Sequence, residues 1–261
     1  MSILNYNNIP KPEQIKERLE NDGYIICNNV IEKKIFDKVQ KYWIDRFNEL
    51  KLKKLKKYDR NFIFRLGEEN FSVKSINKND YRYKIQEFLW NDIEAVTKDI
   101  VIEMHQFCNL TKDLYKNRGL QFTDSQNALS LSVNYYPPEK GYLSPHKDTP
   151  DFILWMIFTL TFKGQDFDEG GLYLIDKKGN KIDISEKLTP GSILFFNGSY
   201  LHGVDKIKSK KNIGYLSVFP FPINFYNQTT IPKSVKIFMK VYDKVVSIIK
   251  PTRKVKRGLD Y

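Results

Sequence analysis

Two histidines and one aspartate have the types and the spacing of a metal site. Asp148 follows His146 by two residues in a segment with strand character. Residues i and i+2 of a strand point to the same side, so an imidazole and a carboxylate can converge on one ion while Lys147 points away. His202 is the only other histidine in the second half of the chain. We therefore predict that His146, Asp148 and His202 bind one metal ion.

The ligand set indicates iron rather than structural zinc. A structural zinc site takes four ligands, usually with cysteine, and Cys27 and Cys108 have no metal-ligand spacing. Two histidines and one carboxylate on one side of an ion leave the other side open, which is the ligand set of non-haem Fe(II) oxygenases. The alternative is a cupin-type jelly roll that binds another metal or none.

The order of motifs in the second half carries a family resemblance. The motifs are His146-Lys147-Asp148, Gly170-Gly171-Leu172, Pro190-Gly191-Ser192 and His202-Gly203-Val204. With them, residues 128–222 resemble the catalytic core of the 2-oxoglutarate/Fe(II)-dependent dioxygenases, most of all the prolyl-hydroxylase-type branch. The segment NDGYIICNNVI, before a predicted helix, is loosely similar to the N-terminal region of phytanoyl-CoA-dioxygenase-type members.

The resemblance implies both a fold and an activity. The fold is α+β with a mainly β core, a double-stranded β-helix (a cupin-like jelly roll) with N-terminal helices packed on one sheet and a C-terminal helix. The activity is that of a dioxygenase that uses Fe(II), O₂ and 2-oxoglutarate as co-substrate, hydroxylates an unactivated C–H bond and releases succinate and CO₂. His146, Asp148 and His202 are its catalytic iron ligands. Because Asp148 is present, hydroxylation is favoured over halogenation.

In enzymes of this resemblance, the distal carboxylate of 2-oxoglutarate meets a cation and a hydroxyl inside the barrel. A buried carboxylate without a partner would cost several kcal/mol. The usual arginine after the second histidine is missing, since no arginine lies between Arg118 and Arg253. We predict Lys211 as the anchor, with Lys163 and Arg65 as the alternatives.

Four further residues complete the predicted co-substrate pocket. Lys211 shares strand parity with Tyr215 and Ser217 if that strand is regular, and both could supply hydroxyls. Asn134 and Tyr136 share a face and form the Asn-x-Tyr that lines this pocket in the resemblance. Ordinary strand packing is the alternative interpretation of both.

The chain divides into three regions of one domain. Residues 1–126 form an N-terminal helical region with a leading strand, and residues 127–225 form the double-stranded β-helix, where short apolar segments alternate with turn signals. Residues 226–261 form a C-terminal helix and a basic tail. This helix is expected to dock on the barrel, and contact with an anionic membrane surface is the alternative.

Apolar periodicity predicts the N-terminal elements in more detail. They are a helix over 11–22, a strand in GYIICNNVI, a helix over 32–57, an irregular segment over 58–84 and a helix over 84–117. The last of these has the apolar stripe Ile85, Phe88, Leu89, Ile93, Val96, Ile100 and Met104.

Amino-acid composition gives only weak information on the partners, substrate and location of the protein. The formal net charge is +12, but lysine far outnumbers arginine and is scattered along the chain. This pattern is more typical of a biased genomic base composition than of a nucleic-acid-binding surface. Two cysteines are too few for a disulfide scaffold, so we expect a cytoplasmic protein. No signal peptide and no apolar run of membrane-spanning length is visible. The oligomeric state stays open.

Four hypotheses about the substrate or role of the protein remain open. The first is a small-molecule or saccharide-type substrate, and the second is a prolyl-type protein side chain. The third is a nucleic-acid base, which only the charge suggests. The last is a jelly roll with a binding role and no catalysis.

Overall fold

The structure is a computed structural model of the 261-residue chain, and it describes residues 3–57, 71–88, 94–110, 127–148 and 155–224. The predicted C-terminal helix, within 226–261, lies outside these residues. Within the part of the chain that is described, no helix has the length and apolar character needed to cross a bilayer.

Within its described residues, the N-terminal half contains three α-helices. They are α1 (Pro12–Asn21), α2 (Lys33–Glu49) and α4 (Ala95–Leu110). The first agrees with the predicted helix over 11–22, but α2 ends well before residue 57. Residues 50–57 instead form a 3-10 turn, η2 (Leu52–Lys54), and the two-residue strand β2 (Lys56–Lys57). Leu50, Leu52 and Leu55 are partly buried against the core, and their spacing of two and then three residues does not follow one face of a helix.

The segment before α4 departs most from the prediction. Residues predicted as irregular structure or as the start of a helix form two antiparallel strands, β3 (Phe71–Ile76) and β4 (Asp80–Phe88). In β4, aromatic or aliphatic residues alternate with polar ones, and this period of two is that of a strand. The prediction counted Ile85 in a helical stripe and missed that its neighbours face the opposite way.

The other strands build the β core. They are β1 (Tyr24–Cys27), β5 (Asn127–Tyr136), β6 (Tyr142–His146), β7 (Trp155–Thr159), β8 (Glu169–Ile175), β9 (Lys181–Asp183), β10 (Ile193–Phe196), β11 (Leu201–Lys208) and β12 (Tyr215–Asn224). Their order is β1-β10-β7-β12-β5-β4-β6-β11-β8-β9, with β3 and β2 attached beside β4.

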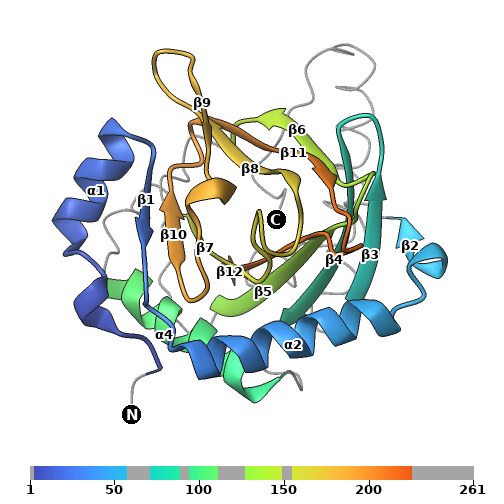
Figure 1. The fold of residues 1–261 in the computed structure, drawn as a ribbon. Coiled ribbons are helices and arrows are strands. Elements are labelled where there is room, and N and C mark those ends of the chain that lie inside the picture. Colours follow the sequence, from blue (N-terminus) through green and yellow to red (C-terminus); the bar gives the residue numbers. More distant parts are fainter. Residues whose placement is uncertain (1–2, 58–70, 89–93, 111–126, 149–154, 225–261) are drawn as a thin grey trace, which may run out of the picture.

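This order describes one sheet that curls into an open barrel. The half β1-β10-β7-β12-β5-β4 faces the half β6-β11-β8-β9, and a short pairing of β4 with β6 at Asp80–Leu143 and Tyr81–Tyr142 joins them. Figure 1 shows the curled sheet with α2 and α4 along the outside of the first half and α1 beside β1. The predicted double-stranded β-helix with helices on one sheet is thus confirmed.

Aromatic side chains fix the helices to the outer face of this sheet. The rings of Phe47 on α2 and Tyr135 on β5 lie 5.2 Å apart, and those of Phe107 on α4 and Phe195 on β10 lie 5.5 Å apart. Because Tyr135 points outward to α2, its neighbour Tyr136 points to the barrel interior. The helices therefore decide which face of each strand remains for a site.

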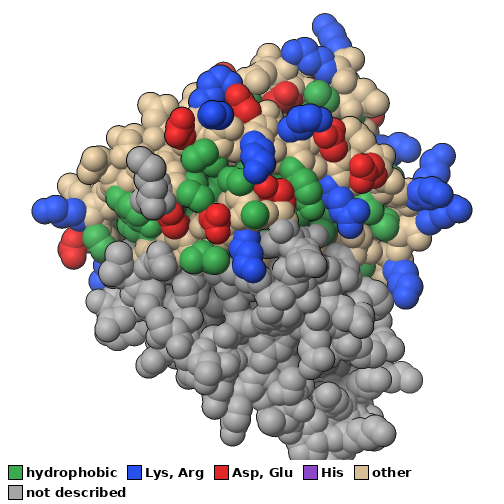
Figure 2. All heavy atoms as spheres, turned by 90° about the horizontal axis from the view of Figure 1, so that it is seen from below, with side chains coloured by type: hydrophobic (Ala, Val, Ile, Leu, Met, Phe, Trp, Pro, Cys, Tyr) green, Lys and Arg blue, Asp and Glu red, His purple; other side chains and the backbone are tan. Residues whose placement is uncertain are grey.

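Charged side chains of both signs share the surface seen from below. Figure 2 shows lysine and arginine interspersed with aspartate and glutamate over the described part of this face. On α2, Lys33 forms an ion pair with Asp37 and Lys41 forms one with Asp45. The positive net charge is therefore not gathered into one patch on this face.

Candidate metal centre

The structure brings the three predicted metal ligands together at one end of the barrel. His146 is the last residue of β6, Asp148 follows it, and His202 on β11 is directly paired with His146. His146 Nε2 lies 3.8 Å from Asp148 Oδ1, and His202 Nε2 lies 3.4 Å from Asp148 Oδ2. One ligand atom from each of the three residues can be chosen so that all three atoms lie within 4.8 Å of one another.

These separations suit a single ion. Ligand atoms about 2.1 Å from one metal lie at most about 4.2 Å apart, and closer when all three are on one side of it. The two imidazole rings lie side by side, with 4.3 Å between their centroids, and each Nε2 lies near one oxygen of the Asp148 carboxylate. Two imidazoles and a carboxylate, with no cysteine, are the donor set expected for Fe(II) with open coordination positions.

Backbone contacts orient both imidazoles, with each Nε2 near the Asp148 carboxylate. His146 Nδ1 lies 3.0 Å from the carbonyl of Ser144, and His202 Nδ1 lies 2.9 Å from the carbonyl of Tyr200. A carbonyl only accepts a hydrogen bond, so each Nδ1 carries the proton and each Nε2 offers its lone pair. The Phe196 ring also packs edge-on against His202, with 5.0 Å between ring centroids.

Gly198 positions the aspartate, and the sequence analysis did not identify it. The Asp148 amide donates to the Gly198 carbonyl at 2.8 Å. A β-carbon at residue 198 would lie 2.8 Å from Asp148 Oδ2 and 2.6 Å from Trp155 Nε1. Only glycine therefore leaves room for the Asp148 carboxylate in this position. Its one sequence signal is the Asn-Gly-Ser turn shortly before His202, which indicates a turn but not its purpose.

The four predicted pocket residues share one buried face of the large half-sheet. Tyr215 on β12 is paired with Tyr136 on β5, and Ser217 is paired with Asn134. Burial raises the pKa of the Tyr136 phenol, which Arg82 partly offsets, and burial likewise raises the pKa of the Tyr215 phenol. Both phenols stay protonated near neutral pH and can donate hydrogen bonds.

The predicted anchoring cations do not join this face. Lys211 is exposed in the turn before β12, and its Nζ donates to the Gln165 carbonyl at 2.5 Å. The strand begins only at Tyr215, so the parity that pointed Lys211 inward does not extend to it. Lys163 Nζ pairs with Asp183 at the end of β9 at 2.5 Å. Arg65 lies outside the described residues.

Two cations that the sequence analysis missed are close to this face. They are Arg82 and Lys84 of β4, the strand that had been predicted as irregular structure. Arg82 Nη1 donates to the Tyr136 hydroxyl at 3.2 Å, and Lys84 is paired with Asn134 across the strands. The polar residues at every second position of 80–86 were the signal that could have found them.

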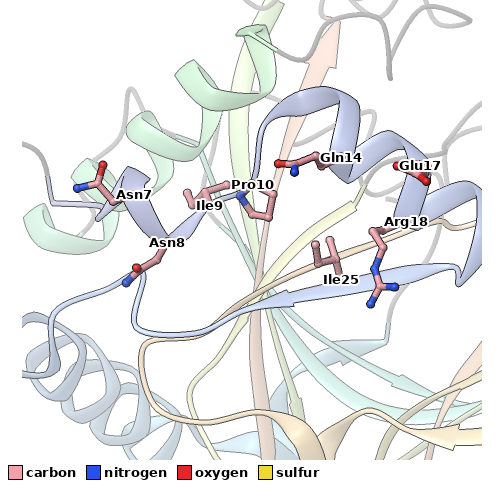
Figure 3. Close-up of a pocket in the computed structure, with 8 residues that line it drawn as sticks. All are labelled: Asn7, Asn8, Ile9, Pro10, Gln14, Glu17, Arg18 and Ile25. Atoms are coloured by element: carbon pink, nitrogen blue, oxygen red, sulfur yellow. The ribbon is translucent and has the colours of Figure 1, made fainter.

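A surface hollow near the N-terminus is separate from this centre. It lies between the Asn7–Pro10 segment, α1 and Ile25 of β1, as Figure 3 shows. Its lining contains no residue of the metal centre or of the polar face beside Tyr136. The chemistry of the histidine and aspartate cluster therefore does not involve it.

Comparison with known proteins supports the fold. No protein-family model and no curated protein matches the sequence. Among solved structures, a prolyl-4-hydroxylase from Pseudomonas putida aligns with a TM-score of 0.55 at 14% identity, over 81% of this chain and 98% of that chain. A prolyl hydroxylase from Trichoplax adhaerens, in complex with a peptide fragment of the hypoxia inducible factor oxygen degradation domain, aligns with 0.53 at 14%, over 85% and 93%. The chain thus has the fold of these hydroxylases.

Proposed function

We propose that this protein is an Fe(II)- and 2-oxoglutarate-dependent oxygenase that hydroxylates a C–H bond. The observation that carries the proposal is the convergence of His146, Asp148 and His202, with both Nε2 atoms directed at the carboxylate. Together, bound Fe(II), 2-oxoglutarate and O₂ supply the oxidant, and 2-oxoglutarate leaves as succinate and CO₂. The fold likeness to two prolyl hydroxylases supports the same reaction class.

The chain's own residues orient the reactants and restrict water. His202 is 5% exposed and lies against Phe196, so one side of the centre is closed by protein. His146 and Asp148 keep about a fifth of their side-chain surface exposed, at 20% and 18%. The centre is therefore accessible from the side of His146 and Asp148, where a substrate can approach. Holding the reacting atoms in one geometry removes much of the entropy cost of the reaction.

For the substrate, we propose a small molecule, including saccharide-type compounds. A prolyl-type side chain is the second candidate, because two structural neighbours are prolyl hydroxylases and one was solved with a peptide. A panel of small metabolites and of proline-containing peptides separates the two. Product formation, seen as a mass increase of one oxygen atom, must follow one panel and not the other.

The test of the reaction class is succinate release with Fe(II), 2-oxoglutarate and O₂, with and without the panels. We expect His146→Ala and His202→Ala each to abolish turnover and to lose stoichiometric Fe(II), because two remaining ligands hold the ion poorly. Lys41→Ala, on the exposed surface of α2, is the matched control and must keep both properties. If the native protein binds no Fe(II), or if both histidine variants keep turnover, the proposal is wrong.

A further inference from the structure

Strand β4 presents its polar residues to the barrel interior. Tyr83 stacks on Tyr135, with 6.4 Å between ring centroids, on the outer face that Phe47 of α2 covers. Arg82 and Lys84 flank Tyr83 in the chain, so they point to the opposite face. The structure therefore places two cations on the face that also holds Asn134 and Tyr136.

Arg82 is held in place from two sides. Its Nη1 donates to the Tyr136 hydroxyl at 3.2 Å, and its Nε lies 3.4 Å from Asp80 Oδ2. The Asp80 carboxylate also accepts hydrogen bonds from Ser75 Oγ at 2.9 Å and from the Asn77 side-chain amide. A guanidinium has five N–H donors in a planar fork, so it can keep these contacts and still bind a carboxylate.

The row next to Arg82 consists of buried polar side chains. Lys84, Asn134, Ser217 and Thr159 follow one another across β4, β5, β12 and β7. Within the part of the chain that the structure describes, Asn134 Oδ1 and Thr159 Oγ1 have no hydrogen-bond partner. Buried polar atoms in proteins are normally hydrogen-bonded, to protein or to something bound. This face is therefore suited to a polar ligand.

The hydrogen-bond partner of Tyr136 indicates which neighbouring strand supplies a cation to this face. Strand β5 has β12 on one side and β4 on the other. On the β12 side Tyr136 faces the neutral Tyr215, and Lys211 is away in a turn. On the β4 side Tyr136 accepts from Arg82. Both cations of β4 qualify by charge, but of these two only Arg82 has a hydrogen bond to Tyr136 in the structure.

We propose that Arg82, together with the Tyr136 hydroxyl, binds the distal carboxylate of 2-oxoglutarate. The inference rests on the proposed function and replaces the Lys211 anchor expected from the sequence. The anchoring cation then comes from a strand outside the region that carries the family motifs. Tyr136 is the shared element, because it can contact the guanidinium and the carboxylate together.

The test is anaerobic calorimetry of the Fe(II)-loaded full-length protein with two keto acids. One is 2-oxoglutarate, and the other is 2-oxopentanoate, which has the same chain length and a methyl group in place of the distal carboxylate. Removing a hydrogen bond to a charged group reduces affinity by about 10- to 100-fold. We expect Arg82→Gln to show this loss for 2-oxoglutarate and to bind 2-oxopentanoate like the native protein. Lys211→Ala is the matched control and must bind both ligands like the native protein.

Lys84→Met and Tyr136→Phe sharpen the assignment. The proposal requires a smaller effect of Lys84→Met than of Arg82→Gln on 2-oxoglutarate affinity. If Arg82→Gln does not fold, Tyr136→Phe decides, because it removes only the hydroxyl and must weaken 2-oxoglutarate selectively. Equal losses for both keto acids, or a larger loss in Lys84→Met or Lys211→Ala, overturn the Arg82 assignment. If the iron-loaded native protein binds neither keto acid, the proposed function itself fails.

Discussion

Replacing Gly198 by alanine should weaken metal binding without touching a ligand. The new β-carbon would lie 2.6 Å from Trp155 Nε1 and 2.8 Å from Asp148 Oδ2, inside the closest ordinary contact. Trp155 is 7% exposed and lies parallel to Phe196, with 6.3 Å between ring centroids, so it has little room to move. Gly198 has no positive φ, so alanine adds no backbone strain there. Asp148 must therefore move.

The resulting displacement of the Asp148 carboxylate is large compared with the variation in ligand distance that a metal site tolerates. Ligand distances in such sites vary by only about 0.2 Å, and loss of a supporting contact typically reduces affinity by about 10- to 100-fold. We expect a loss of that size for Fe(II) in Gly198→Ala. Overpacking should also lower the free energy of unfolding by about 1–3 kcal/mol.

Anaerobic Fe(II) titration and urea unfolding measure the two effects separately. Gly141→Ala is the matched control, because its β-carbon would lie 2.5 Å from the Tyr136 backbone and 2.7 Å from that of Pro137, not against a metal ligand. We expect this control to lose stability and to keep its Fe(II) affinity. Native-like Fe(II) affinity in Gly198→Ala, or an equal loss in Gly141→Ala, would refute the steric reasoning.

Two further predictions concern the rest of the structure. Thr97→Val should lower the free energy of unfolding in urea by about 1–3 kcal/mol, because the buried Trp43 Nε1, which lies 3.1 Å from Thr97 Oγ1, loses that acceptor. The control Lys33→Ala, on the surface, should change the free energy of unfolding by less than about 0.5 kcal/mol. Equal effects of the two substitutions would contradict the prediction. Burial raises the pKa of the Cys27 thiol to about 12, so in Cys108→Ser a thiol reagent at pH 8 should modify Cys27 only after unfolding. Rapid labelling of that folded variant would show the thiol to be accessible.

Local patterns were enough to predict the cluster of His146, Asp148 and His202 and the β core. His146 and Asp148 are two residues apart, and that spacing alone puts both side chains on one side of an extended chain. The turn signals between short apolar segments likewise predicted the strands after residue 127. These features depend on neighbours in the chain, which is why they could be inferred without knowing how strands pair.

The errors arose where distant segments meet. The sequence predicts irregular structure and helix where strand β4 lies, because its aromatic and aliphatic residues also fit a helical period over a short window. Its strand conformation depends on pairing with β3, β5 and β6, two of which lie further along the chain. Lys211 was placed on a strand that begins four residues later, because a turn boundary is set by the strand pairing around it.

The sequence by itself determined the donor atoms of the candidate metal centre and the β character of the segments that hold them. These follow from side-chain chemistry and from the two-residue period of a strand. The tertiary structure alone decided that Gly198 packs against Asp148 and that Arg82 contacts Tyr136. Contacts across strands depend on register and curvature, which arise only when the whole sheet closes.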